Sequence, residues 1–253
     1  MGATNNAGRK RGMPAAATIL IIAVAALGVW AIARSRMGGP AALLFTPPWS
    51  EGEVSTLEIR KDGVVLGQWE MRVEARGIET ALVSVMKAEA SEETAAVIVN
   101  PATLVPSRTE FEEKSAQGQA TYIAEYGPSD VVISAQTPNG PQEARMKLPK
   151  PPYFDNEQMV MVLRALPLAM GFKATLNDII TRAASKDTVE VEVVKKETVD
   201  VSAGSFEAWA VQFRGTGQTA WIAVDPQRQL VKYENTRAGT VSELTKYSGG
   251  QRQ

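Results

Sequence analysis

The sequence lacks both cysteine and histidine over its 253 residues. Without cysteine there is no disulfide framework, thiol nucleophile or thiolate metal site. Without histidine the chain lacks the usual general base at neutral pH, the commonest zinc ligand and any Ser-His-Asp triad. A calcium loop and a G-x-S-x-G elbow are also missing, and Arg214-Gly215-Thr216-Gly217 lacks the Lys-Ser/Thr of a phosphate-binding loop. We therefore expect no metal and no cofactor.

Basic residues are concentrated at the N-terminus. Residues 1–36 contain five Lys or Arg and no acidic residue, so the rest of the chain has 27 − 5 = 22 basic against 28 acidic residues, a net charge of −6. A domain with this charge is repelled by phosphate backbones and by anionic lipid surfaces, so we expect no nucleic-acid partner.

One long run without charge, residues 13–33, predicts a transmembrane anchor. About twenty helical residues at ~1.5 Å each span the ~30 Å hydrocarbon core of a bilayer. Arg9, Lys10 and Arg11 favour a cytoplasmic basic tail over residues 1–12, which places the C-terminal domain outside the cytoplasm of a single-pass protein of the cytoplasmic membrane. The alternative is signal cleavage after Ala31-Ile32-Ala33, which would leave a secreted or periplasmic domain.

Proline and glycine interrupt residues 34–52, which we predict to be a linker. Its apolar residues Leu43, Leu44, Phe45 and Trp49 either lie on the membrane or dock onto the following domain. We expect an exported β-rich domain over residues 53–248 and a disordered tail over residues 249–253.

Apolar and polar residues alternate through most of residues 53–248, which predicts an antiparallel sheet with one buried face. Lys61-Asp62-Gly63 marks the first hairpin turn, between strands that contain Leu57 and Trp69. Further strands are expected at Ala81–Lys87, Ala95–Val99, Ser107–Glu112, Ala120–Tyr126, Val131–Ala135, Thr188–Val194, Phe206–Phe213, Thr219–Val224, Leu230–Asn235 and Thr240–Tyr247.

The two halves of the domain, residues 53–150 and 153–248, show signs of being repeats. The segment from Val97 aligns with the segment from Trp221, so that Asn100-Pro101 meets Asp225-Pro226 and Tyr126 meets Tyr247. A strand, an Asx-Pro turn, a strand, a Gly turn and a strand ending in Tyr make a plausible duplicated unit. Chance similarity between two meanders is the alternative.

A helix is expected to begin at Asp155, with Gln158 as its capping-box partner. Met159, Val162, Leu163 and Leu166 form an apolar stripe, and Pro167 ends the helix. We expect this amphipathic helix to cover the open face of the sheet. A second helical turn is predicted around Leu176–Ala183.

Residues 153–247 resemble family 3108 of the domains of unknown function, whose members are exported bacterial β-proteins. The resemblance is carried by Val162–Leu168 with Gly171, Glu197, Ala203–Phe206, and Trp221–Pro226 running into Leu230-Val231-Lys232. It implies a curved antiparallel sheet or half-barrel with a helix in its concavity, similar to folds that carry or position lipoproteins. It implies no catalytic residue. We match no first repeat and no anchor to typical members.

Five residues on strands predict an apolar groove for a ligand: Trp69, Met71, Trp209, Phe213 and Trp221. In a curved, partly covered sheet they would line a site for a lipid or another apolar ligand. Packing between sheet and helix is the plainer interpretation of the same residues.

The sequence favours a non-catalytic envelope protein, tethered to the membrane, that binds a lipid or a protein partner. The competing hypothesis is an envelope hydrolase with paired carboxylates. Its candidate residues are the pair Glu190 and Glu192, with Glu197 and Asp200 close behind. Glu190 and Glu192 alternate with valines and so fall on the wet face of a strand. A hydrolase requires two acidic groups facing each other across a cleft, with at least one pKa raised by burial.

Overall fold

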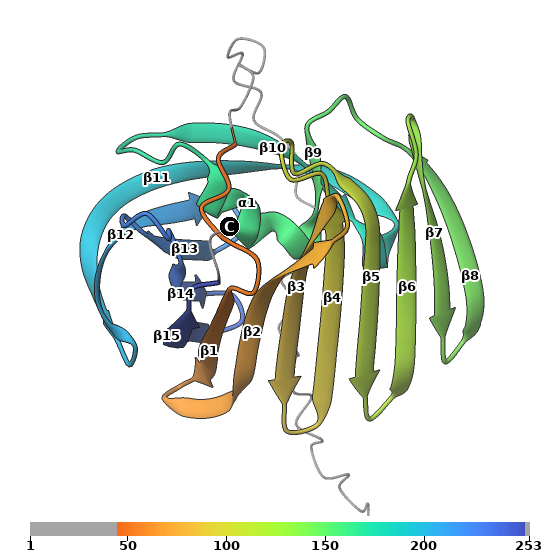
Figure 1. Cartoon of the computed structure of the whole chain (residues 1–253). Coiled ribbons are helices and arrows are strands. Elements are labelled where there is room, and N and C mark those ends of the chain that lie inside the picture. Colours follow the sequence, from red (N-terminus) through yellow and green to blue (C-terminus); the bar gives the residue numbers. More distant parts are fainter. Residues whose placement is uncertain (1–44, 251–253) are drawn as a thin grey trace, which may run out of the picture.

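The computed structural model describes residues 45–250, which form one strongly curved sheet of 15 strands. Figure 1 shows the strands of the first half standing side by side, while β10 and β11 cross behind them. The mainly β prediction is confirmed, and the arrangement resembles a barrel that remains open between its two edge strands.

The first half of the sheet is a meander in which each strand pairs with the next. Along β1 and β4, buried residues alternate with more exposed ones, as the period-two pattern predicts. The strands are β1 (Val54–Lys61), β2 (Val64–Arg76), β3 (Glu79–Ala88), β4 (Ser91–Val99), β5 (Pro106–Ser115), β6 (Gly118–Tyr126), β7 (Asp130–Thr137) and β8 (Gly140–Lys147).

The second half begins at the opposite edge and returns to the first. The sheet order is β8 to β1 and then β15 to β9, so β1 pairs with β15 and the two halves share one sheet. All pairs are antiparallel except β9 with β10. The strands are β9 (Tyr153–Asp155), β10 (Lys173–Ile180), β11 (Ser185–Val201), β12 (Gly204–Phe213), β13 (Gln218–Ala223), β14 (Leu230–Asn235) and β15 (Thr240–Ser248).

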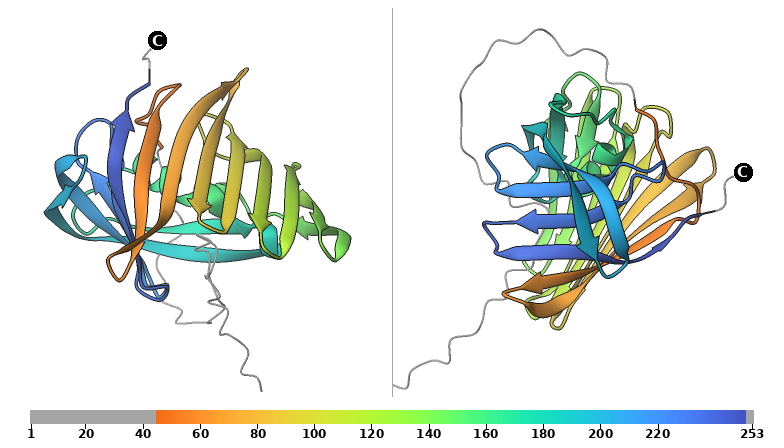
Figure 2. Two further views of the ribbon diagram at one scale, coloured as in Figure 1. Left: turned by 90° about the horizontal axis from the view of Figure 1, so that it is seen from below. Right: turned by 90° about the vertical axis from the view of Figure 1, so that its left-hand side faces the viewer.

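Curvature brings the β9–β10 edge across the hollow of the first half, as the side views show (Figure 2). The 3₁₀ turn η1 (Asn156–Gln158) follows β9, and the 3₁₀ turn η2 (Thr181–Ala183) follows β10, at this edge. Thr109 on β5 donates its hydroxyl to Asp155 on β9 at 2.9 Å, and Lys186 on β11 donates to the carbonyl oxygen of Lys147 on β8 at 3.0 Å. Polar contacts therefore close the gap that sheet pairing leaves.

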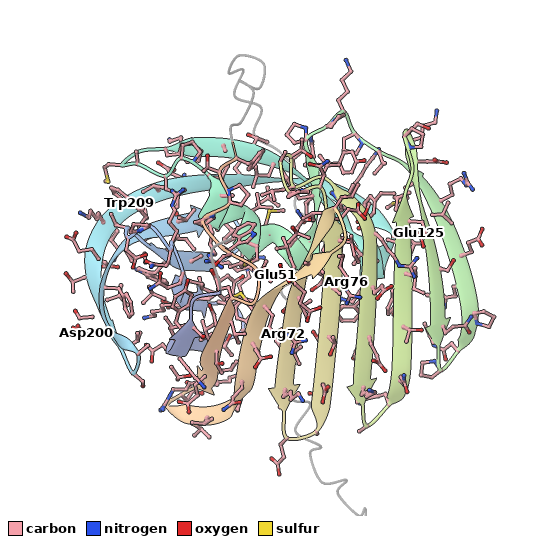
Figure 3. All side chains as sticks on the ribbon, in the orientation of Figure 1. Glu51, Arg72, Arg76, Glu125, Asp200 and Trp209 are labelled. Atoms are coloured by element: carbon pink, nitrogen blue, oxygen red, sulfur yellow. The ribbon has the colours of Figure 1, made fainter. Side chains whose placement is uncertain are left out.

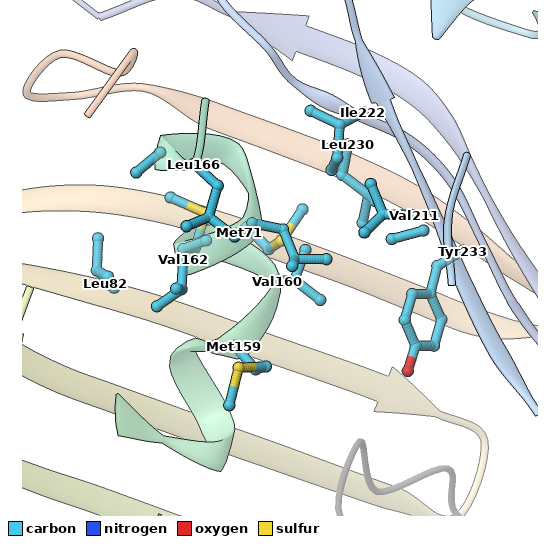
Figure 4. Packing of buried hydrophobic residues seen from close by; sticks show 14 of the residues in the cluster. Met71, Leu82, Met159, Val160, Val162, Leu166, Val211, Ile222, Leu230 and Tyr233 are labelled. Carbon is cyan, nitrogen blue, oxygen red and sulfur yellow. The ribbon is translucent and has the colours of Figure 1, made fainter. Parts of the chain in front are cut away.

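The predicted helix is present, but it is enclosed rather than covering. Asp155 is the N-cap, its capping box with Gln158 is formed, and α1 (Met159–Ala165) follows η1. All residues of α1 are buried, including Arg164, because strands from both halves surround it (Figure 4). The expectation of an amphipathic helix on an open face is wrong, since the curved sheet leaves the helix no wet side.

The Asx-Pro turns of the two halves have the same local structure. The side-chain oxygen of Asn100 accepts the N–H groups of Ala102 and Thr103, at 2.9 and 3.2 Å. In the same way, the side-chain oxygen of Asp225 accepts the N–H groups of Gln227 and Arg228, at 2.9 and 3.0 Å. Both halves also run along the sheet in the same direction, as duplicated units would. A duplication remains a prediction.

One predicted element is wrong, and several predictions fall at or beyond the start of the structure. Residues 173–180 form β10, so of the helical turn expected at Leu176–Ala183 only η2 exists. Residues 45–52, assigned to the linker, pack on the domain: Phe45 lies 5.4 Å from Phe154, and the Thr46 N–H donates to Ala165 at 3.0 Å. Within residues 45–250 no helix is long and apolar enough to cross a membrane. The predicted anchor at residues 13–33, Leu43, Leu44 and residues 251–253 lie outside the described residues.

Candidate functional site

Three of the five residues predicted to line an apolar groove are core residues. Trp69, Met71 and Phe213 are 3%, 4% and 4% exposed, in the same cluster as α1. The Trp69 indole N–H donates to the Ser84 hydroxyl at 2.7 Å, and its ring meets Tyr233 edge-on at 5.8 Å. Sheet and helix together fill the space that these side chains were expected to leave open.

The two remaining tryptophans point to opposite faces of the sheet. Trp209 pairs with Ile222, a core residue, and lies half-buried at the edge of the core, in the middle of β12 and away from the β11–β12 turn beside Asp200 (Figure 3). Trp221 is the neighbour of Ile222 in the strand and so points the other way, onto Ala208, Ala210 and Ala223. The five residues therefore do not line one groove.

The carboxylates proposed for a hydrolase do not face each other across a cleft. Glu190 is exposed. Glu192 is paired with Lys173 and Arg214, at 3.2 and 3.5 Å. Glu197 accepts hydrogen bonds from Lys195 and from the Trp221 indole, which lower its pKa. Carboxylates held in the charged form by cations are poor proton donors.

Folding instead buries a different set of acids, which we call the carboxylate cluster: Glu93, Asp155, Glu157 and Asp178. They come from β4, β9, η1 and β10, with Arg182 of η2 as the neighbouring cation, 3.5 Å from Glu93 and 3.6 Å from Glu157. The Arg182 guanidinium also lies over the Phe111 ring at 4.5 Å. One arginine thus faces several carboxylates at the place where the second half packs against the first.

Hydroxyl groups satisfy Asp155. Its Oδ2 accepts from Thr109, Tyr126 and Thr181 at 2.9, 2.6 and 2.5 Å, and its Oδ1 accepts the Glu157 N–H at 2.9 Å. Asp178 is satisfied at one oxygen only, by the Asn156 amide at 2.9 Å, and its Oδ1 has no partner. Asp155 therefore connects β5, β6, β9 and η2 in one network.

Burial raises the pKa values of the whole cluster. Loss of hydration raises the pKa of Glu157 to about 8 and that of Asp178 to about 7. Loss of hydration also raises the pKa of Asp155, although its four hydrogen bonds act to lower it. It raises the pKa of Glu93 as well, although the positive charge of Arg182 acts to lower it. At neutral pH Glu157 is therefore mostly protonated, which limits repulsion within the cluster.

The cluster has the pKa values of a functional site but not its access. Asp155 and Asp178 are 0% exposed and Glu93 is 3% exposed, so a substrate has no path to them. Across residues 45–250 no group of three or more acidic side chains is arranged to hold a metal ion. Sequence reasoning missed the cluster because its members are up to 85 residues apart (178 − 93), and only the capping role of Asp155 signalled any of them.

A hollow on the surface lies beside this cluster. We call it the rim groove; its volume is about 990 Å³, and it lies where the upper ends of the first-half strands meet the connector between β8 and β9. Tyr126 and Tyr153 stack at 6.0 Å in its wall, and the Tyr126 hydroxyl reaches Asp155 behind it. Its other lining residues are Glu79, Asn100, Thr103, Val105, Pro106, Ser107, Gly127, Pro128, Ser129, Lys147, Leu148, Pro149, Lys150 and Pro151.

The fold is similar to that of a solved bacterial protein. A β-barrel-like protein of domain of unknown function DUF1849 from Brucella abortus is 11% identical, with a TM-score of 0.50 over 80% of this chain and 99% of that chain. A putative exported protein with a YmcC-like fold from Bacteroides fragilis is 14% identical, covering 82% and 100%, with a TM-score of 0.29. A DUF1089 family protein from Pseudomonas aeruginosa is 14% identical, covering 79% and 97%, with a TM-score of 0.35.

No curated protein matches the sequence. One family model matches residues 49–244, which include both halves of the sheet. The resemblance found from the sequence was limited to residues 153–247, and the match corrects it by including the first half. The match covers more than half of the chain, and the chain therefore belongs to DUF3108, a family of proteins of unknown function.

Proposed function

We propose that the chain is a non-catalytic binding module of the cell envelope, anchored by residues 13–33, with its ligand site in the rim groove. The observation that carries this proposal is the groove itself, a hollow of about 990 Å³ with stacked tyrosines, hydroxyl groups and lysines in its wall. Aromatic faces with a few converging polar groups are typical of ligand sites.

The interior of the sheet is a poorer candidate for the ligand. Leu163, Leu166 and Ile222 are 0% exposed, and α1, which contains Leu163 and ends just before Leu166, fills the hollow (Figure 4). A lipid carrier needs an apolar cavity, whereas these side chains already have apolar partners. The proposal therefore moves the ligand from the predicted aromatic groove to the rim.

The arrangement of acids supports binding rather than hydrolysis. Of the carboxylates proposed for a hydrolase, Glu192 and Glu197 are paired with lysine, and Glu190 is exposed on the strand. The carboxylates with raised pKa values have little access: Asp178 is 0% exposed, and the Glu157 side chain is 5% exposed. Neither carboxylate lines the rim groove, where acid–base catalysis on a bound substrate would require it.

Single cysteines test location and occupancy together, because the native chain has none. Ser129→Cys places a thiol in the groove, and Asn139→Cys places one in the exposed turn between β7 and β8 at the other end of the strands. Each full-length variant is labelled with a membrane-impermeant maleimide in spheroplasts, and again after purification in detergent.

We expect Asn139→Cys to react at the same rate in both preparations and Ser129→Cys to react slowly in spheroplasts only. Labelling of both at unchanged rates would show an empty groove and contradict the binding site. Labelling of neither until the cells are lysed would place the domain in the cytoplasm and contradict the proposed topology.

A further inference from the structure

We propose that the rim carrying the groove docks onto the bilayer in which the chain is anchored, with Lys147 and Lys150 contacting anionic phospholipid headgroups. This inference deepens the proposed function and rests on it, since it requires the anchor at residues 13–33. Three independent features of the rim point to the bilayer as its partner.

The first feature is where the described chain begins. Phe45 packs on Phe154, next to the groove residue Tyr153, so the chain enters the domain at the same upper end as the groove (Figure 2, right). Eleven residues (34–44) separate Phe45 from the end of the anchor, and the twelve Cα–Cα steps between residues 33 and 45 span at most about 40 Å. The ten residues of β3 span about 33 Å, which is the distance from the rim to the opposite end of the first-half strands. That opposite end can face the membrane only if the segment between the anchor and Phe45 is almost fully stretched.

The second feature is the charge of the rim. Of the lysines elsewhere in residues 45–250, five are paired with carboxylates, namely Lys87, Lys114, Lys173, Lys195 and Lys196, and four are not, namely Lys61, Lys186, Lys232 and Lys246. Lys147 and Lys150 are exposed and have no carboxylate within 4.0 Å among residues 45–250. The groove lining holds these two cations against one acid, Glu79, although the chain beyond residue 36 is acidic. Juxtamembrane lysines are attracted by anionic lipid surfaces.

The third feature is an apolar tip beside these cations. Ile78 lies in the turn between β2 and β3, next to the groove residue Glu79, and is 93% exposed. It is the most exposed of the large apolar side chains in residues 45–250. Arg76, in the same hairpin, is paired with Glu74 at 3.3 Å, so the unpaired cations of the rim are Lys147 and Lys150. An exposed apolar tip on the same rim as unpaired lysines is a pattern of surfaces that insert at the headgroup level.

The test uses the full chain in nanodiscs of phosphatidylcholine, with or without phosphatidylglycerol, that contain a headgroup-spin-labelled lipid. A fluorophore is attached to Ile78→Cys or, as the control, to Asn139→Cys, and quenching by the spin label is measured. Each labelled chain is also made with the double substitution Lys147→Gln and Lys150→Gln. The control is a second double substitution that removes the same charge, Lys87→Gln and Lys114→Gln. These two control sites lie at the ends of β3 and β5 that are away from the rim.

We expect quenching at position 78 but not at position 139, only when phosphatidylglycerol is present. Substituting both Lys147 and Lys150 should abolish the quenching, because each lysine lost lowers the docking equilibrium constant about fivefold. Substituting Lys87 and Lys114 should leave the quenching unchanged. Equal quenching at both positions, none at position 78, or quenching that ignores phosphatidylglycerol and the rim lysines would overturn the proposal. A chain that does not elute with the nanodiscs would contradict the anchor itself, and the docking with it.

Discussion

Arg164 connects three separate parts of the chain from inside the sheet. Its guanidinium is 2.7 Å from the Glu53 carboxylate, donates to the carbonyl oxygens of Gln227 and Arg228 at 2.9 and 2.8 Å, and lies 5.5 Å from the Trp49 ring. Both charges are buried, with side-chain exposures of 1% and 3%. Removing one partner of such a pair leaves an uncompensated buried charge.

We therefore predict that Arg164→Gln lowers the free energy of unfolding by about 3–5 kcal/mol. Urea unfolding of the full chain in detergent, followed by tryptophan fluorescence, measures it. The control is Arg72→Gln, whose partner Glu70 is 37% exposed, and for which a loss of about 0–1 kcal/mol is expected. Similar losses in the two variants would show that the buried pair does not hold the entering segment in place.

Gly67 lies in β2 where the neighbouring strand comes unusually close. A Cβ at this position would be 1.9 Å from the carbonyl oxygen of Lys87 on β3. We predict that Gly67→Ala lowers the free energy of unfolding by about 1–3 kcal/mol, because the backbone must shift. The neighbouring Gln68→Ala, at an exposed position, should change it by less than about 0.5 kcal/mol. The same urea titration compares them, and an unaffected Gly67→Ala chain would contradict the close approach of β2 and β3.

At the scale of elements, the carboxylate cluster decides how firmly the β9–β10 edge is held against β4, β5 and β6. The charged or titratable groups that face Glu157 and Asp178 are Glu93, Asp155, Arg182 and, from β11, Asp187. Glu113 on β5 adds to the negative charge near Glu93. Ionisation of Glu157 and Asp178 therefore adds repulsion at the closing contact.

This arrangement predicts that stability falls as pH rises. Burial raises the pKa of Glu157 from its ordinary value of 4.5 to about 8 in the folded state, so between these two values the folded state binds more protons than the unfolded state. The contribution of this group is present in full below pH 4.5 and is lost by about pH 8. Unfolding by urea at pH 5 and pH 9 should differ by a few kcal/mol.

Glu157→Gln should remove much of this pH dependence, because the amide cannot ionise. The control is Glu190→Gln, an exposed carboxylate that should leave the dependence unchanged. A native chain that is equally stable at both pH values, or more stable at pH 9, would contradict the protonation of the cluster.

Most elements of the fold follow from local patterns, and the exceptions have physical causes. Leu57 and Trp69 alternate with polar residues because their strands have one wet face, so these strands could be predicted. In β10, Asp178, Ile179 and Ile180 are all buried, since the strand crosses inside the curved sheet. The alternation of apolar and polar residues is then lost, and the spacing of apolar residues from Leu176 onward resembles that of a helix.

The candidate site was harder to predict than the fold. Trp221 was placed in a groove with Trp69, yet it covers alanines on the opposite face, because sequence gives the alternation within a strand but not which face is concave. The rim groove is made by turns and by the proline-rich connector before Tyr153, and these have no periodicity to interpret. Only the fold brings them together.

At the scale of the whole molecule, the account depends on the helix being part of the core and not a lid. If α1 fills the hollow permanently, the ligand must bind at the rim; if it opens, an apolar ligand can enter beside Trp69 and Met71. Burial of every residue of α1, and of Leu166 after it, favours the first arrangement. Exchange of backbone amide hydrogens distinguishes the two, since local opening exposes amides without unfolding the sheet.

The most direct measurement is therefore hydrogen–deuterium exchange with mass spectrometry on the full chain. The account predicts that the amides of Met159–Ala165 exchange as slowly as those of β1 and β15 at the centre of the sheet, while Gly127–Ser129 in the rim exchange first. Exchange of the helix at the rate of the rim, with β1 and β15 still protected, would show a lid over an accessible interior and contradict the assignment of the ligand site to the rim groove.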